Sequence, residues 1–335
     1  MSNVKSTNIL VGIIVFVCAV PSCKITKAEG IMKYSTWLNL WLENYVKPSN
    51  KTRTYLRYRQ IATNHVAHYL GEQEIDDITP LELQQYVSKL LDCGNIKTGK
   101  GLAPNTVNTV ISVLQNSLKT AHALGYAKNY AASALKRPRI AEHGVECFSF
   151  DEQKKIEFAV QNCKKTKMLG VLLCLYSGLR IGELLALKWS DIDFDKGLLT
   201  VSHSCHDCEG KLVFDTPKTD HSHRLIPLPK QIVPILKKLK KTEKSEFVVS
   251  QNGNPVGVRS YQRSFELLLK KLDIRHRGFH SLRHTFATRA LECGMDVKTL
   301  SEILGHKNPI VTLNRYTHSL LEHKSAMMNR LGKLL

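Results

Sequence analysis

The chain of 335 residues is long enough for two domains of ordinary size, at least one of them with a sizeable core. Its 48 lysines and arginines against 29 acidic residues give a formal net charge of +19, which favours a polyanionic partner over an acidic small molecule. The nine cysteines are odd in number and scattered singly, which argues against a disulfide framework and fits a reducing compartment.

Residues 9–20 form an uncharged apolar run that resembles the hydrophobic part of a signal peptide. The run is short for a membrane span, which needs about 20 apolar residues. Two explanations are preferred: a translation start placed too far upstream, with Met32 as the working initiator, or a dispensable tail. A secreted or membrane-tethered product is the alternative, and a mature chain beginning at Cys23 would support it.

From Tyr34 onward the pattern is that of a small all-helical unit. Three basic residues of the second helix interleave with aromatic residues, which suits contact with a duplex backbone, although a solvated helix face remains an open alternative. These candidate DNA contacts are Arg53, Arg57 and Arg59. The predicted helices are Trp37 to Tyr45, ended by Pro48, Ser49 and Asn50; Thr52 to Leu70; one opened by Thr79 and Pro80; and Asn105 to Leu124.

The stretch from Lys136 to Arg139 is basic and contains a proline, and a polar passage follows it. These features indicate a linker and a domain boundary, with one domain over residues 32–139 and a second over 140–335. Arg137 and Arg139 are further candidates for contact with DNA phosphates.

In the second unit, a buried helix from Met168 to Tyr176 leads directly to Arg180. A charge between apolar neighbours is costly unless it is paired, so Arg180 is expected to have an anionic partner. Glu183 is the nearest acid, and a phosphate-like ligand is the second possibility. A purely structural ion pair would also satisfy the pattern.

Three short strands are predicted after Arg180, with helices after them. The turn after the second strand holds Lys218 at a hairpin tip. His203, Cys205, His206 and Cys208 resemble half of a zinc site, but no second CxxC follows at finger spacing, and a simple hairpin turn is favoured. The strands are 198–202, 211–215 and 225–228, and the helices are 232–240 and 258–272.

The C-terminal part gathers His280, Arg283, His306 and Tyr316 within one short interval. His280 and Arg283 are three residues apart at the start of a helical pattern that ends at Gly294, so they are expected to project toward a common point. Asp296 can cap a second helix that stops at Gly305, a short turn carries Tyr316, and residues 319–331 form a terminal helix. Two helices joined across a glycine also describe a helix-turn-helix, so a DNA-binding regulator remains an alternative.

The ordered set of Arg180, Lys218, the H-x-x-R of residues 280–283, the L-G-H of residues 304–306 and Tyr316 resembles the tyrosine recombinases, the phage integrase family. The segments YSGLRIGELLALKW and LGHKNPIVTLNRYTH carry the resemblance, which covers roughly residues 34–330. It implies a mainly helical fold with a small antiparallel sheet in the catalytic domain, and two domains that clamp DNA. Residues 32–139 would be a SAM-like core-binding domain and residues 140–335 the catalytic domain.

The resemblance also implies the chemistry: site-specific cutting and rejoining of DNA through a 3′-phosphotyrosyl intermediate, which needs no cofactor and no metal. A phosphodiester attacked by a phenol gains negative charge that rigid guanidinium groups can stabilise. Tyr316 would be the nucleophile, Arg180 and Arg283 the charge stabilisers, Lys218 the proton donor to the leaving oxygen, His280 and His306 phosphate ligands, and Glu183 an orienting group.

The implied partners are double-stranded DNA with specific recombination sites, a homotetramer on two such sites, and an accessory directionality factor. The implied location is the cytoplasm, on DNA, and the implied biology is integration or excision of a mobile element. The residues before Met32 are few and apolar, so no arm-binding domain is expected. A type IB topoisomerase, which uses a comparable residue set, is the nearest rival.

Overall fold

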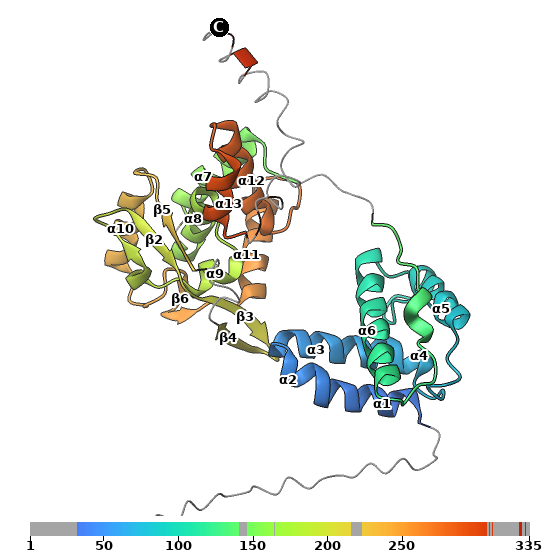
Figure 1. Cartoon of the computed structure of the whole chain (residues 1–335). Helices are drawn as coiled ribbons and strands as arrows, with labels where there is room; N and C mark the ends of the chain where they lie inside the picture. Colours follow the sequence, from blue (N-terminus) through green and yellow to red (C-terminus); the bar gives the residue numbers. More distant parts are fainter. Residues whose placement is uncertain are drawn as a thin grey trace, which may run out of the picture. The chain divides into compact units, whose positions relative to one another are not determined.

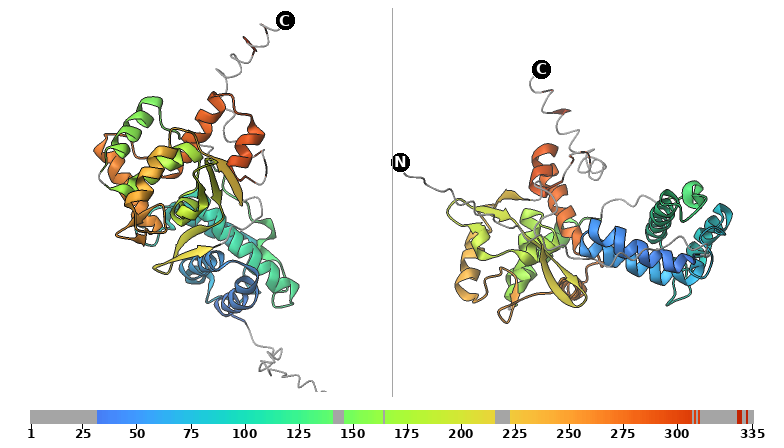
Figure 2. Two further views of the ribbon diagram at one scale, coloured as in Figure 1. Left: turned by 90° about the vertical axis from the view of Figure 1, so that its left-hand side faces the viewer. Right: turned by 60° about the horizontal axis from the view of Figure 1, so that its bottom comes forward.

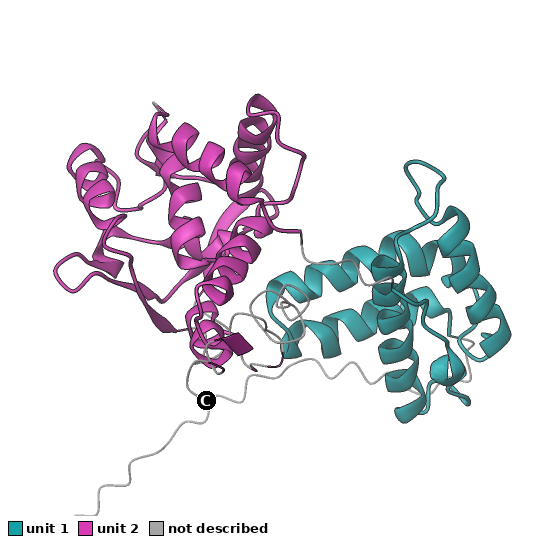
Figure 3. Cartoon of the chain, turned by 90° about the horizontal axis from the view of Figure 1, so that it is seen from above, with its two compact units in different colours: residues 1–141 teal, residues 142–335 magenta. Residues whose placement is uncertain are grey.

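The computed structural model describes residues 32–140, 146–163, 165–215 and 223–306, together with residues 308, 310, 328, 329 and 332. The chain divides into two compact units, residues 1–141 and 142–335 (Figure 3). Each unit has its own hydrophobic core. Residues 1–31, Lys218, Tyr316 and most of the expected terminal helix lie outside the described residues.

All helices and strands named in the described part of the first unit are helices, joined by loops (Figure 1). Thr79 caps the third long helix by accepting a hydrogen bond from the main-chain N–H of Glu82, and Pro80 takes the first helical position, as the sequence predicts. The first helix runs through Pro48 and ends at Ser49, slightly later than expected. The elements are α1 (Tyr34–Trp41), a π-helical stretch (Leu42–Val46), α2 (Lys47–Ser49), α3 (Thr52–Ile61), a second π-helical stretch (Ala62–Ala67), α4 (His68–Leu70), α5 (Pro80–Cys93), α6 (Pro104–Ala123) and a 3₁₀ turn (Ala131–Ala134).

The apolar stripe of α6 forms the middle of the first core, as its helical spacing predicts. The apolar side chains of this stripe, between Val107 and Ala121, are buried in the same cluster as Trp37 and Trp41 of α1. Leu124 was expected to belong to the stripe, but it caps the helix at the surface and is 44% exposed.

The second unit combines helices and short strands, and α8 is its central helix, in contact with α7, α9 and α12. Ser149 and Glu152 form a reciprocal capping box at the start of α7, which agrees with the helix start expected near Phe148. The helices are α7 (Phe150–Gln161), α8 (Leu169–Ser177), α9 (Ile181–Ala186), α10 (Val233–Thr242), α11 (Val258–Lys271), α12 (His280–Glu292) and α13 (Val297–Leu304), with 3₁₀ turns at Thr166–Met168 and Trp189–Asp191. Figures 1 and 2 show these helices lying around the strands.

All described strands pair antiparallel. They make a three-stranded sheet in the order β1-β2-β5 and two separate hairpins, β3-β4 and β6-β7. The sequence analysis missed β3 and the two-residue strands β1, β6 and β7. It missed β3 because its residues, SCHDC, are mostly polar and lack the branched and aromatic residues that mark a strand. The strands are β1 (Ile192–Asp193), β2 (Leu198–Val201), β3 (Ser204–Cys208), β4 (Lys211–Asp215), β5 (Arg224–Pro227), β6 (Ser250–Gln251) and β7 (Asn254–Pro255).

The expected fold class, mainly helical with small antiparallel sheets, is therefore confirmed. Within the described residues, none of the helices combines the length and apolar character that crossing a membrane requires. The apolar run at residues 9–20 lies outside that part of the chain.

Replacing Leu114 by alanine should lower the free energy of unfolding of the first unit by about 2–5 kcal/mol, because Leu114 is fully buried in the middle of α6. Urea unfolding followed by tryptophan fluorescence measures this effect. The measurement uses a Trp189→Phe background, in which the two remaining tryptophans, Trp37 and Trp41, both report on the first unit.

Leu124→Ala is the matched control, since it removes the same atoms from a surface position at the end of the same helix and should change stability by less than about 0.5 kcal/mol. Equal losses in the two variants would contradict the assignment of α6 as the centre of the core.

Candidate active site

The guanidinium group of Arg283 is the most deeply buried charge of the candidate site, with 2% of the residue exposed. It projects from α12 and donates hydrogen bonds to the main-chain carbonyls of Gly178, at 2.8 Å, and Leu304, at 2.7 Å. These carbonyls lie at the C-terminal ends of α8 and α13, where helix carbonyls lack helical partners and the helix dipole favours positive charge. The helix ends therefore compensate the burial of Arg283.

Arg180 is the N-cap residue of α9, and the expectation that it pairs with Glu183 is confirmed. Its Nη1 donates to Glu183 Oε1 at 2.8 Å, and its main-chain N–H donates to Glu183 Oε2 at 2.9 Å. Its Nη2 reaches the carbonyl of Gly305 at 3.1 Å. The side chain is 37% exposed, so a ligand at the surface of the unit can contact it.

A third arginine, Arg224, completes the group, and the sequence analysis missed it. It opens β5 and is 7% exposed. Its Nη2 and Nη1 donate to the two carboxylate oxygens of Glu183, at 2.8 and 3.1 Å, and its Nε donates to the carbonyl of Ile303 at 2.6 Å. One sequence signal was available: the two-residue period of a strand places Arg224 on the same face as the buried Ile226.

Three successive carbonyls at the end of α13 thus accept hydrogen bonds from three different arginines. Arg224 binds Ile303, Arg283 binds Leu304 and Arg180 binds Gly305. We refer to the carbonyls of residues 303–305 as the α13 carbonyl cluster. It ties α12, the start of α9 and the start of β5 to one helix end.

The carboxylate of Glu183 carries a full negative charge within this group. Burial by itself raises its pKa, but the hydrogen bond and charge of Arg224, together with Arg180, more than offset burial and lower the pKa to about 2. Three guanidinium groups against one carboxylate leave a local excess of positive charge, which suits a phosphate dianion or diester.

His306 follows the α13 carbonyl cluster directly, after Gly305 turns the chain in the left-handed conformation, φ +64°. Its Nε2 lies 2.9 Å from Nη2 of Arg283. Since a guanidinium group has only donors, His306 accepts this hydrogen bond at Nε2, which places the ring proton on Nδ1.

His280 occupies the first position of α12 and is exposed, whereas Arg283 faces the interior of the unit. The ring of His280 packs edge-on against His284, with the centroids 4.5 Å apart. His280 therefore lies at the surface of the unit and Arg283 lies in its interior. The three-residue spacing alone does not predict this difference in burial.

Lys218 and Tyr316, the other two residues of the expected catalytic set, lie outside the described residues. Their roles stay predictions.

The candidate DNA contacts of the first unit are all at its surface. Arg57 on α3 donates to the side chain of Thr109 on α6 at 3.2 Å, and Arg59 lies over the ring of Tyr55. Arg53 and Arg139 are exposed.

Arg137 is held against α6 by several hydrogen bonds. It donates to the carbonyl of Asn108 at 3.0 Å, to Ser112 Oγ at 3.1 Å and to Gln115 Oε1 at 2.8 Å. The segment expected to be a linker is therefore fastened to the first unit at this residue, so a contact of Arg137 with a phosphate has to compete with these bonds.

The histidines and cysteines of the β3-β4 hairpin do not converge. Cys205 and Cys208 are three residues apart on one strand, so their side chains point to opposite faces. Cys205 is buried, and Glu209 and Gly210 form the turn with positive φ angles of 48° and 80°. Among the described residues, no group of three or more histidine, cysteine or acidic side chains is arranged to hold a metal ion.

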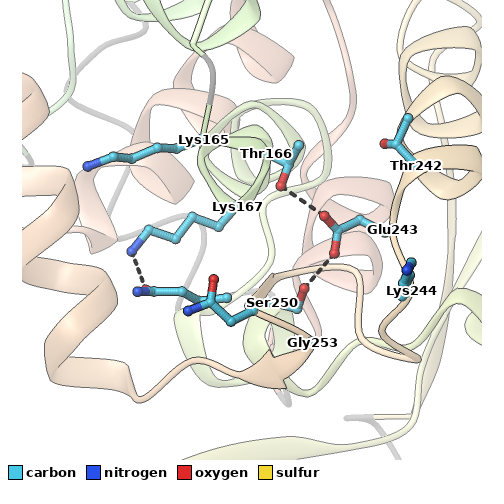
Figure 4. A pocket seen from close by; sticks show the side chains of 10 residues that line it. Lys165, Thr166, Lys167, Thr242, Glu243, Lys244, Ser250 and Gly253 are labelled. Carbon is cyan, nitrogen blue, oxygen red and sulfur yellow. Dashed lines mark hydrogen bonds between the residues drawn. The ribbon is translucent and has the colours of Figure 1, made fainter.

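A surface pocket of about 610 Å³ lies elsewhere in the second unit, and none of the candidate catalytic residues line it (Figure 4). Its polar side chains bind one another: Glu243 accepts from Thr166 at 2.9 Å and from Ser250 at 2.6 Å, and Lys167 donates to Gln251 at 2.8 Å. These bonds fasten the 3₁₀ turn before α8 to the segment after α10. The polar side chains that line the pocket therefore serve to hold these two segments together.

The lowered pKa of Glu183 predicts a pH-dependent contribution to stability. A carboxyl group whose pKa is lower in the folded state stabilises the protein above its unfolded-state pKa, near 4.5, and loses that contribution as the pH falls through about 2. Glu183→Gln should therefore cost on the order of 3 kcal/mol at pH 7 and progressively less at pH 4 and 3, measured by urea unfolding.

Glu246→Gln serves as the control, because its ion pair with Lys188 is exposed and should be worth less than about 1 kcal/mol. A penalty for Glu183→Gln that stayed constant from pH 7 to pH 3 would contradict the lowered pKa.

Comparison with known proteins agrees with this arrangement. Residues 148–323, more than half of the chain, match the phage integrase family, and residues 33–91 match the N-terminal SAM-like domain of phage integrases. A XerC-like tyrosine recombinase of Caldanaerobacter subterraneus subsp. tengcongensis is 30% identical, over 89% of this chain and 82% of the relative.

Two solved structures share the fold. The Tn1549 transposon integrase in complex with a circular intermediate DNA superimposes with a TM-score of 0.76 and 23% identity, over 90% of this chain and 99% of that chain. A lambda integrase tetramer bound to a Holliday junction superimposes with a TM-score of 0.65 and 22% identity, over 84% of this chain and 80% of that chain. The family match over residues 148–323 and the relative at 30% identity establish that this chain belongs to the phage integrase family and is a tyrosine recombinase, an enzyme that breaks and rejoins DNA at specific sites.

Proposed function

We propose that this recombinase cuts one DNA strand with Tyr316 and stabilises the reacting phosphate with Arg180 and Arg283. The observation that carries the proposal is the α13 carbonyl cluster, which gathers both arginines beside His306. Guanidinium groups are permanently charged and have a planar fork of donors, so they suit the non-bridging oxygens of a phosphodiester.

In the proposed reaction the phenolic oxygen of Tyr316 attacks phosphorus, and the bond between phosphorus and the 5′-oxygen breaks. The tyrosine loses its proton, and the leaving 5′-oxygen takes a proton from Lys218. The products are a 3′-phosphotyrosyl link and a free 5′-hydroxyl. Rejoining is the reverse reaction with a 5′-hydroxyl of another strand, so the link conserves the bond energy and no nucleotide cofactor is needed.

The histidines and Glu183 have supporting roles in this proposal. His306, with its proton on Nδ1, can donate a hydrogen bond to the phosphate while Arg283 holds Nε2. His280 is exposed on the first turn of α12, where it can bind phosphate and help to accept the phenolic proton. Glu183 orients Arg180 without touching the DNA.

Double-stranded DNA is the proposed substrate, and the two units are proposed to close on it as a clamp. Residues 32–139 would be the core-binding domain and residues 140–335 the catalytic domain. The formal charge of +19 and the exposed Arg53, Arg57, Arg59 and Arg139 support contact with the phosphate backbone. The proposed location is the cytoplasm, in association with DNA. The free cysteines among the described residues are consistent with such a reducing compartment.

Integration or excision of a mobile element is the proposed biological role. It is supported by the shared fold and near-complete overlap with the Tn1549 transposon integrase. The active assembly would be a homotetramer on two DNA sites, as for the lambda integrase tetramer on a Holliday junction. An accessory directionality factor would set the balance between integration and excision.

Tyr316→Phe should bind DNA with unchanged affinity and form no covalent adduct, because it lacks only the attacking oxygen. The substrate is a duplex that the wild-type chain has selected from a randomised pool, nicked next to the mapped cleavage position so that the cleaved fragment diffuses away. Adduct is measured on a denaturing gel. An adduct formed by Tyr316→Phe would exclude Tyr316 as the nucleophile.

The same preparation tests recombination directly. Wild-type protein should join two selected sites, and a failure to join them would contradict the proposed biological role.

Arg180→Lys should reduce the rate of adduct formation by about 100-fold or more, because an ammonium group cannot make two parallel hydrogen bonds and cannot reach Glu183 and Gly305 at once. Single-turnover kinetics on the selected duplex measure the rate. Lys188→Arg, at an exposed surface pair, is the control and should leave the rate unchanged. A loss of less than threefold for Arg180→Lys would contradict its proposed role.

A further inference from the structure

We propose that Arg224 is a positioning residue for strand cleavage: it fixes the guanidinium group of Arg180 through Glu183 and the α13 carbonyl cluster without contacting DNA itself. The proposal rests on the function proposed above, in which Arg180 binds the reacting phosphate. Arg224 does not belong to the catalytic set that the sequence indicates, and the structure alone brings it into the site.

Arg224 is not expected to contact the substrate, because its charge is paired with the carboxylate of Glu183 and its donors are engaged within the protein. Its side chain is 5% exposed, whereas that of Arg180 is 37% exposed. Its three nitrogens all donate to protein oxygens at 2.6 to 3.1 Å. A DNA phosphate at the surface can therefore meet Arg180 but not Arg224.

Glu183 is the link between the two arginines. Its Oε1 accepts from Nη1 of both Arg180 and Arg224, and its Oε2 accepts from the Arg180 main chain and from Nη2 of Arg224. The fork of Arg224 holds the carboxylate at both oxygens, so the carboxylate plane is fixed before Arg180 binds it. Without Arg224, the carboxylate would be free to rotate about its side-chain bonds, and Arg180 would lose a fixed acceptor.

Arg224 also supports the second acceptor of Arg180. Its Nε binds the carbonyl of Ile303, two residues before the Gly305 carbonyl that Arg180 uses. Gly305 packs so closely against the Arg224 side chain that an added Cβ would lie 3.0 Å from Nη1 and 3.1 Å from Cδ. The end of α13 and β5 also lie side by side in the fold (Figure 1). Both acceptors of Arg180 thus depend on one buried side chain.

A residue that only positions a catalytic group affects the reaction rate through that group. Once the catalytic group has been replaced, replacing the positioning residue should therefore slow the reaction little further. Arg224→Lys keeps the charge but cannot span both oxygens of Glu183 and the Ile303 carbonyl. We expect it to bind the selected duplex within threefold of wild type and to form adduct about 30- to 100-fold more slowly. In the Arg180→Lys background, Arg224→Lys should slow the reaction by less than threefold further.

Arg289→Lys is the matched control. Like Arg224, the partly buried Arg289 donates to a carboxylate, that of Glu292, and to a main-chain carbonyl, that of Phe148. It should lower thermal stability without slowing adduct formation by more than threefold. Two results would overturn the proposal: an unimpaired rate in Arg224→Lys, or a defect that multiplies fully with that of Arg180→Lys.

If Arg224→Lys does not fold, as judged by circular dichroism and thermal melting, Glu183→Gln breaks the same link from the other side. Glu183→Gln should slow adduct formation in the wild-type background, but by less than threefold in the Arg180→Lys background. An equal loss of rate in both backgrounds would overturn the proposal. Failure of the proposed function is distinguishable, since wild-type protein would then form no adduct at all.

Discussion

The site depends on the unpaired carbonyls at the end of α13. An α-helix leaves its last carbonyls without helical partners, and here three in succession accept from arginines of three separate segments. The negative end of the helix dipole offsets the cost of gathering like charges, and Glu183 neutralises one of the three. A small displacement of this helix end would move all three guanidinium groups together.

Two left-handed glycines make this geometry available. Gly305 ends α13 at φ +64° and Gly178 ends α8 at φ +65°, which are angles that other residues adopt only at a cost. A Cβ at Gly178 would lie 2.6 Å from the ring of Phe286, and one at Gly305 would press on Arg224. Both positions therefore need glycine for the backbone angle and also for the space that a neighbouring side chain occupies.

Local patterns in the sequence predicted much of the fold and part of the site. The stripe of α6, the cap at Thr79 and the pairing of Arg180 with Glu183 involve residues within one element or three residues apart, so propensity and spacing determine them. Arg224 and Glu183 are 41 residues apart, and their contact arises from the packing of β5 near α9, which no local pattern encodes. The polar strand β3 was missed because its pairing with β4, and not its composition, makes it a strand.

The same long-range contacts decide which atoms of the site can donate to a ligand. Arg283 donates a hydrogen bond to Nε2 of His306, which fixes the tautomer of the ring and leaves its proton on Nδ1. Glu183 likewise holds one edge of the Arg180 guanidinium, while more than a third of that side chain faces solvent. Donors oriented in advance need little reorganisation when charge develops on a phosphate. In the proposed reaction, Glu183 and the α13 carbonyl cluster therefore contribute to the electrostatic stabilisation through the arginines that they hold, although they do not touch the substrate themselves. In the proposed mechanism, the action of Arg180 and Arg283 on the phosphate thus depends on the groups that hold them in place, Glu183 and the end of α13.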